Sequence, residues 1–227
     1  MKKRILSLIL ALSMVLSVLP LGAFAEGSTN SKELVMGSNG LPTCSNNTSG
    51  NGWRYWNGTL YLNDGTYDFS STHPKGGGET TTTPVLCKIE IESGANITGG
   101  IFEKEVRNKG KISGGTFKSS VTNFAGGTIS GGTFSKVYNN SGTISDGTFK
   151  GIVSNSSTIS GGTFQNGCNV TNYSSGTISG GTFACSVENK GTINGNGTFN
   201  GTVTNSYTIE NGSFKSNVTN NGSINGG

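Results

Sequence analysis

The sequence is poor in charged residues, in large apolar residues and in histidine. Of its 227 residues, 12% are charged and 31% are hydrophobic, and the only histidine is His73. An ordinary enzyme domain of this length has a larger apolar share. Disordered chains carry more net charge, and four prolines exclude a proline-rich or collagen-like chain. One histidine leaves almost no ligand set for a structural metal and no Ser/His or Cys/His pair, so we expect no metal and no cofactor.

Long apolar runs are also scarce, and the one present lies at the amino terminus. Basic residues at 2–4 precede an apolar run over 5–21, and Ala23-Phe24-Ala25 supplies small residues before Glu26. This pattern predicts a secretory signal peptide over residues 1–25 and a secreted or cell-surface protein without a membrane span after cleavage. The alternative is an uncleaved membrane anchor. Cleavage leaves 13 basic and 12 acidic residues, a balance that argues against a nucleic-acid partner.

Glycine is abundant, with 38 residues, and a repeat accounts for much of it. After about residue 96 the chain repeats the unit T-I-S-G-G-T-F-x-x-x-V-x-N-x-G, with eight complete copies over 97–223. Three large apolar residues per unit, separated by glycine or asparagine, are typical of short strands joined by tight turns. One unit cannot bury enough apolar surface to fold alone, so neighbouring units must stack. The sequence therefore predicts an all-β, single-stranded parallel β-helix (β-solenoid) with about 15 residues per coil.

An asparagine follows each Val position, or Tyr138 in one unit, by two residues. In an extended strand it shares the inward face of that residue, where stacked amides donate to and accept from the copies above and below. The alternative is that these residues only tolerate left-handed turns at the corners. The predicted ladder consists of Asn108, Asn123, Asn140, Asn155, Asn172, Asn189, Asn205 and Asn220.

Four cysteines are compatible with an oxidising exterior and allow three pairings. Cys168 and Cys185 each lie two residues before a Val, so one unit per coil stacks them as neighbours, whereas two units per coil would separate them. We therefore predict a disulfide between Cys168 and Cys185, and by elimination one between Cys44 and Cys87.

The segment before the repeat divides into two parts. Residues 26–50 are polar and predicted to be flexible. Residues 51–95 are predicted to form an aromatic N-terminal cap and a degenerate first coil, interrupted by a glycine- and threonine-rich loop over 70–84, with the repeats following over 96–227. The repeat stops within a ninth unit, which suggests truncation.

Two functions are open for the aromatic residues of this segment. They cover the open end of the solenoid, where strand edges would otherwise invite aggregation, or they form a platform on which sugar rings stack. The candidate platform residues are Trp53, Tyr55, Trp56 and Tyr61.

Catalysis has little support in the sequence. β-Helix enzymes that cleave acidic polysaccharides use clustered carboxylates, and no such cluster recurs here. Outward Thr and Ser residues flank the repeated Ile, as at Thr128 and Ser130, and such rows could order water on an ice-binding face, although β-propensity explains them equally well.

The signal peptide, the segment G-W-R-Y-W-N-G-T-L-Y-L-N-D-G-T-Y-D-F at 52–69 and the tandem G-T-I-S-G-G-T-F units together carry a resemblance. They resemble repetitive secreted and cell-surface proteins of Gram-positive gut bacteria, which are similar to parallel β-helix adhesins and are sometimes described as carbohydrate-binding. Together with the export signal and the lack of a catalytic constellation, the resemblance favours a non-enzymatic secreted or cell-surface scaffold or adhesin, for which we expect host or microbial glycans or surface proteins as partners. The alternatives are a carbohydrate-binding module and, less favoured, a polysaccharide-degrading enzyme.

Overall fold

The fold is known from a computed structural model, which describes residues 48–70, 72–74 and 80–226 together with residues 34, 36, 39, 41 and 42. The predicted signal peptide, most of the 26–50 segment and Cys44 lie outside the described residues. Every regular element in the described part is a strand, and no helix there could cross a membrane. The strands are β1 (Thr48–Gly50), β2 (Trp53–Trp56), β3 (Thr59–Asp68), β4 (Thr72–Pro74), β5 (Thr80–Thr82), β6 (Lys88–Gly99), β7 (Ile101–Phe102), β8 (Val106–Asn108), β9 (Lys111–Ile112), β10 (Thr116–Asn123), β11 (Thr128–Asn139), β12 (Thr143–Asn155), β13 (Thr158–Ile159), β14 (Thr163–Phe164), β15 (Asn169–Asn172), β16 (Thr177–Ile178), β17 (Thr182–Phe183), β18 (Ser186–Asn189), β19 (Thr192–Phe199), β20 (Val203–Asn205), β21 (Thr208–Phe214), β22 (Val218–Asn220) and β23 (Ser223–Ile224).

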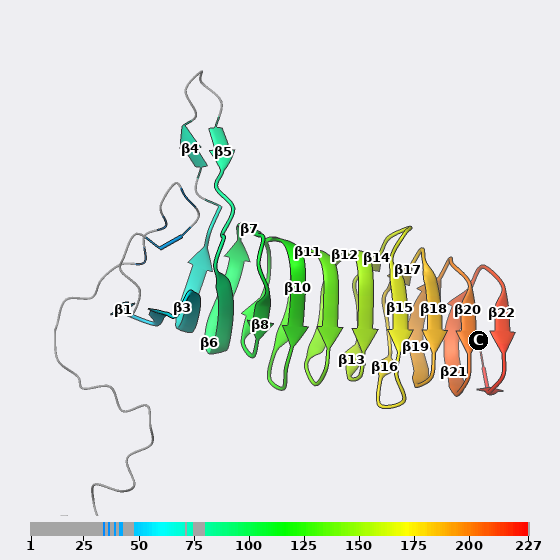
Figure 1. Cartoon of the computed structure of the whole chain (residues 1–227). Helices are drawn as coiled ribbons and strands as arrows, with labels where there is room; N and C mark the ends of the chain where they lie inside the picture. The colour runs from blue at the N-terminus through cyan, green and yellow to red at the C-terminus, as the bar shows by residue number, and fades with distance from the viewer. Residues whose placement is uncertain are drawn as a thin grey trace, which may run out of the picture. The chain divides into compact units, whose positions relative to one another are not determined.

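Successive repeats stack as parallel coils, one repeat per coil, as the sequence predicts (Figure 1). Strands β11 and β12 pair in parallel so that Ile129 faces Ile144, Phe134 faces Phe149 and Val137 faces Val153. The same like-to-like register continues to β22 and β23. Each coil thus has an Ile face, a Phe face and a Val face, and the core lies between them.

The Phe side chains form a continuous internal stack. From Phe102 to Phe214, neighbouring ring centroids lie 4.3 to 5.2 Å apart, with interplanar angles of 5 to 15°. This spacing matches the distance between hydrogen-bonded strands, so the backbone ladder sets the ring separation. Burying these rings with the Ile and Val columns supplies the apolar area that a single unit lacks.

A glycine pair makes the bend between the Ile and Phe strands. Gly115 has φ of 101°, a left-handed conformation that side chains rarely adopt. A Cβ on Gly114 would collide with the carbonyl oxygen of Thr98 in the preceding coil. The recurrent Gly-Gly of the repeat therefore suits both the turn and the close stacking of coils. Where Asp146 or Asn211 replaces the first glycine, the pairing with the preceding coil shifts register.

An Asn ladder runs through the core, and it confirms the stacked-amide interpretation over the left-handed-turn alternative. In each described rung, Nδ2 donates to Oδ1 of the Asn in the next coil at 2.7 to 2.9 Å, over sequence separations of 15 to 17 residues. Each of these Nδ2 groups also donates to the carbonyl oxygen of the Thr or Ser that begins the Ile strand of that next coil. The ladder members are Asn108, Asn123, Asn139, Asn155, Asn172, Asn189, Asn205 and Asn220.

One predicted rung is wrong, because Asn139 rather than Asn140 belongs to the ladder. Asn139 is fully buried, and Asn140 is exposed. The unit is one residue shorter between Phe134 and Val137, and a register shift in the β10–β11 pairing absorbs the difference. Val137 therefore occupies the apolar position that the repeat spacing gave to Tyr138.

The aromatic segment forms the predicted cap. Strands β1, β2 and β3 form an antiparallel meander, and β3 pairs in parallel with β6, the first full coil. Phe69 packs edge-on against Phe102, at 5.6 Å and 83°, and so ends the parallel ring stack. The cap begins at Thr48, within the segment predicted to be flexible, and the predicted 70–84 loop contains the antiparallel pair β4–β5.

The predicted disulfides are absent among the described cysteines. Cys87, Cys168 and Cys185 are all free, buried thiols. Asn169 pairs with Ser186, so Cys168 and Cys185 are neighbours in consecutive coils, as the one-unit coil requires. Stacking is therefore confirmed, and covalent pairing is not. Cys44, the predicted partner of Cys87, lies outside the described residues.

Candidate functional site

The four candidate platform residues divide between two faces of the β2–β3 hairpin. In the antiparallel register Trp53 faces Leu62 and Tyr55 faces Leu60, and this side packs on the core. Trp53 is 3% exposed, whereas Trp56 is 47% exposed. Trp53 and Tyr55 therefore serve the cap, which leaves Trp56 and Tyr61 as the surface candidates.

Trp56 and Tyr61 share the outward face of the hairpin with Arg54. The hairpin turns at Asn57-Gly58, where φ is 46° and 74°, the left-handed pair that a tight two-residue turn requires. The Arg54 guanidinium lies 4.2 Å from the centroid of the Tyr61 ring. An indole, a phenol and a cation held on one rigid hairpin offer stacking and hydrogen bonding to a ligand.

The Tyr67 hydroxyl ties this hairpin to the first coil. Its oxygen lies 2.6 Å from the carbonyl oxygens of both Gly52 and Asp64. Burial, and to a lesser extent the negative charge of Asp64, raise the pKa of Tyr67. The hydroxyl is therefore a structural donor, which holds the β1–β2 turn against β3.

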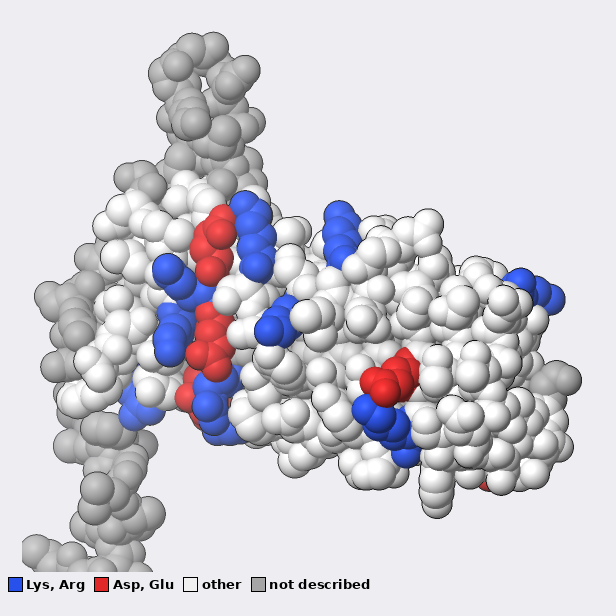
Figure 2. All heavy atoms as spheres, turned by 45° about the vertical axis from the view of Figure 1, so that its right-hand side comes forward, with Lys and Arg blue, Asp and Glu red and all other residues white. Residues whose placement is uncertain are grey.

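Next to the hairpin, charged side chains gather over the first coils, while the remaining coils carry only scattered charges (Figure 2). The ion pairs join consecutive coils: Lys109 contacts Glu90 at 2.8 Å and Glu92 at 3.0 Å, and its pKa is raised chiefly by those hydrogen bonds. We call this group the charged band; its members are Lys88, Glu90, Glu92, Glu103, Glu105, Arg107, Lys109 and Lys118. Each of its carboxylates is in an ion pair, so the band fastens the first coils together.

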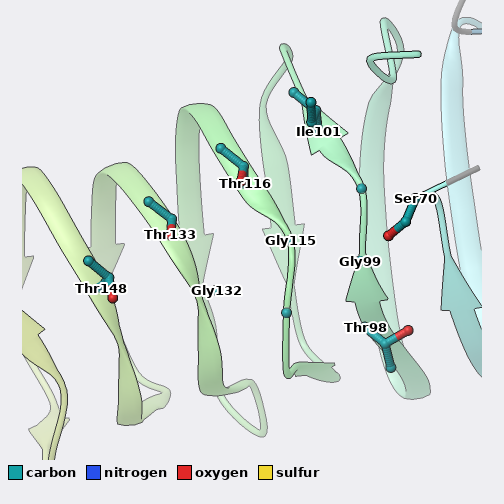
Figure 3. A pocket seen from close by; sticks show the side chains of 11 residues that line it. Ser70, Thr98, Gly99, Ile101, Gly115, Thr116, Gly132, Thr133 and Thr148 are labelled. Carbon is teal, nitrogen blue, oxygen red and sulfur yellow. The ribbon is translucent and has the colours of Figure 1, made fainter. Parts of the chain in front are cut away.

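A shallow polar groove of about 550 Å³ crosses several coils on the side where the Gly-Gly bends lie (Figure 3). Its floor is glycine backbone, as at Gly99, Gly115 and Gly132, and hydroxyl side chains line it. The hydroxyl residues are Ser70, Thr98, Thr116, Thr133 and Thr148. The groove contains no charged residue, so it offers one hydroxyl per coil to a neutral polar ligand.

The Ser column beside the repeated Ile is committed to the backbone. The hydroxyl of Ser130 donates to the carbonyl oxygen of Ile112, and that of Ser145 to Ile129. Ser113, Ser160 and Ser179 make the equivalent bond. Because the Ser hydroxyls donate to the preceding coil, their protons are not available to order water as one of the paired rows that an ice-binding face would use.

The carboxylates offer limited chemistry. Asp68 accepts a hydrogen bond from the Ser70 amide at 2.9 Å, and hydrogen bonding to Ser70 lowers its pKa. Asp146 accepts from the Gly147 amide at 2.7 Å and replaces a glycine of the bend. Among residues that the structure describes, no three His, Cys, Asp or Glu side chains cluster as metal ligands.

The thiols are the most chemically distinctive groups inside the repeat. The Cys168 thiol hydrogen-bonds to the Cys185 sulfur, which lowers the pKa of Cys185 and raises that of Cys168. Burial raises the pKa of the Cys87 thiol to about 11.

Sequence reasoning missed the groove and the charged band. The sequence shows each Gly-Gly pair as a turn signal. The pairs form a groove only when the coils stack and their glycines, which lack side chains, line up.

No protein-family model matches the chain, and no curated protein and no solved structure matches it.

Proposed function

We propose that this chain is a non-enzymatic solenoid scaffold, secreted or displayed at the cell surface, that makes adhesive contacts through its outward faces. The carrying observation is the unbroken set of Phe, Ile, Val and Asn columns, which fixes every outward residue at a set position in its coil. The signal-peptide pattern supports export. The resemblance to repetitive surface proteins of Gram-positive gut bacteria supports adhesion.

The outward-facing side chains also favour a role in binding over a role in catalysis. The carboxylates of the charged band are engaged in ion pairs, and the Ser hydroxyls beside the Ile column are engaged with the backbone. An acid or base catalyst needs a carboxylate or imidazole directed at a substrate. A polysaccharide-degrading activity therefore has less support, and a sustained release of reducing ends from acidic polysaccharides by the purified chain would establish it.

The test of the scaffold proposal has two steps. Protease treatment of intact producing cells should remove cell-bound protein, or the protein should be found in the medium. Beads coated with the exported chain should then adhere to mucin-coated or cell-coated surfaces more strongly than beads coated with heat-unfolded chain. Retention of the protein inside cells, or equal adhesion by both bead types, would contradict the proposal.

Carbohydrate binding is the second candidate, and the outward placement of Trp56 beside Tyr61 and Arg54 favours it. A glycan array probed with the exported chain should show selective binding that Trp56→Ala abolishes. Tyr207→Ala is the matched control, because Tyr207 is an exposed aromatic residue on a distant coil. Equal loss in both variants, or binding unchanged by Trp56→Ala, would reject the hairpin as the glycan site.

A further inference from the structure

The repeat contains two cysteines, and the structure places them side by side. Cys168 and Cys185 occupy the same position of consecutive coils, immediately before the paired residues Asn169 and Ser186. They are 6% and 5% exposed, and their thiols share a hydrogen bond. They are therefore two inward-facing sulfur ligands at the corner that leads into the Val face.

The coils on either side carry a glycine at the position equivalent to these cysteines. In the coil that precedes Cys168, Gly151 lies opposite Cys168, because the next residues, Ile152 and Asn169, are paired. Gly201 lies against the backbone of Cys185 in the following coil. Glycines thus flank the thiol pair, so the equivalent position of neither neighbouring coil supplies a third ligand, and among the described residues no third His, Cys, Asp or Glu joins the pair.

We propose that Cys168 and Cys185 form a two-coordinate site for a soft, monovalent d¹⁰ cation such as Cu(I) or Ag(I). Soft thiolate ligands select ions of this class. A structural Zn²⁺ ion uses four ligands, and two sulfurs alone do not meet that requirement.

The exchange balances without a redox step. The incoming cation bonds to both sulfurs, and the two thiol protons leave for solvent. The neutral thiol pair thereby becomes an S–metal–S unit with one net negative charge, shared between the two sulfurs, so bound cation should be lost as the pH falls. No electron is transferred, so no oxidant or reductant is needed.

The test uses a reference variant, Cys44→Ala with Cys87→Ala, in which the pair supplies all the remaining thiols. Anaerobic calorimetric titration with Ag(I) in chloride-free buffer should show one ion bound per chain. The melting midpoint should rise with Ag(I), since a ligand that binds the folded state stabilises it. Zn(II) should neither bind comparably nor raise the midpoint.

Adding Cys168→Ala or Cys185→Ala to the reference should weaken Ag(I) binding by about 10²- to 10⁴-fold, because the second sulfur binds intramolecularly. Circular dichroism confirms folding, and either single variant suffices if the other fails to fold. The proposal is overturned if a folded single variant binds Ag(I) as tightly as the reference, if Zn(II) binds equally well, or if the anaerobically purified pair is already an oxidised disulfide.

Discussion

Asn123 and Asn139 stack directly in the core, with Nδ2 of Asn123 donating to Oδ1 of Asn139 at 2.9 Å. The intervening unit is one residue short between its Phe and its Val, yet the Asn column does not break. The coil takes up the missing residue outside the ladder. Amide stacking and apolar burial together therefore determine which residue is inward, more strongly than the count of residues between landmarks.

Substitution of the true ladder residue should be costly. Asn139→Ala removes the acceptor of one Asn123 Nδ2 proton, and it removes the donor to the side-chain oxygen of Asn155 and to the carbonyl oxygen of Thr158. Each unsatisfied buried group costs about 1–3 kcal/mol, so we expect a loss of about 2–4 kcal/mol. Denaturant unfolding measures it, and Asn140→Ala is the control, with an expected change within about 0.5 kcal/mol at this exposed side chain. An equal loss of unfolding free energy in both variants would contradict the assignment of Asn139, rather than Asn140, to the ladder.

The Phe stack should be equally sensitive in its middle. Phe149 is fully buried between Phe134 and Phe164, with centroids at 5.2 and 4.6 Å. Phe149→Ala should lower the unfolding free energy by about 3–5 kcal/mol through lost burial and the cavity left behind. Phe124→Ala provides the comparison, because this ring is only half-buried on the outer surface beneath Arg107. A similar loss from both substitutions would argue that the stack is not the principal core.

Substitution of the two tryptophans should have very different effects on stability. Trp53→Ala should cost about 3–5 kcal/mol, since Trp53 packs on Leu62 and the core beneath the cap. Trp56→Ala should shift the unfolding free energy by much less than Trp53→Ala does, since Trp56 is about half exposed on the outer face of the hairpin. Thermal melting of both variants measures the contrast. Strong destabilisation by Trp56→Ala would show that the cap includes the outer face as well.

Stability should fall at alkaline pH because of Cys87. The pKa of its thiol is raised to about 11 in the folded chain from an ordinary value of 9.0. The unfolded chain therefore loses this proton first, and stability present below pH 9 declines between pH 9 and 11 by at most about 3 kcal/mol. Unfolding midpoints across this range should fall more steeply for the native chain than for Cys87→Ala. Parallel curves would show that Cys87 ionises equally in both states.

The sequence by itself determined the fold. Ile, Phe, Val and Asn recur at nearly fixed spacing between turn residues, and a unit with so little apolar surface is stable only when it stacks on its own kind. The Cys168 and Cys185 spacing likewise predicted their adjacency. These inferences succeeded because they depend on periodicity, and the order and spacing of the residues show that periodicity directly.

Only the tertiary structure decided which of several neighbouring residues faces inward and what the outward ones do. It shows that Asn139 rather than Asn140 is the ladder residue, that Trp53 is buried while Trp56 is exposed, and that the two adjacent thiols are not joined by a disulfide. The tertiary structure also brings together the charged band and the glycine-floored groove, because their residues come from different coils. Side-chain orientation in a strand reverses with every residue, so a single insertion or deletion changes the outcome, and only the packed coils resolve it.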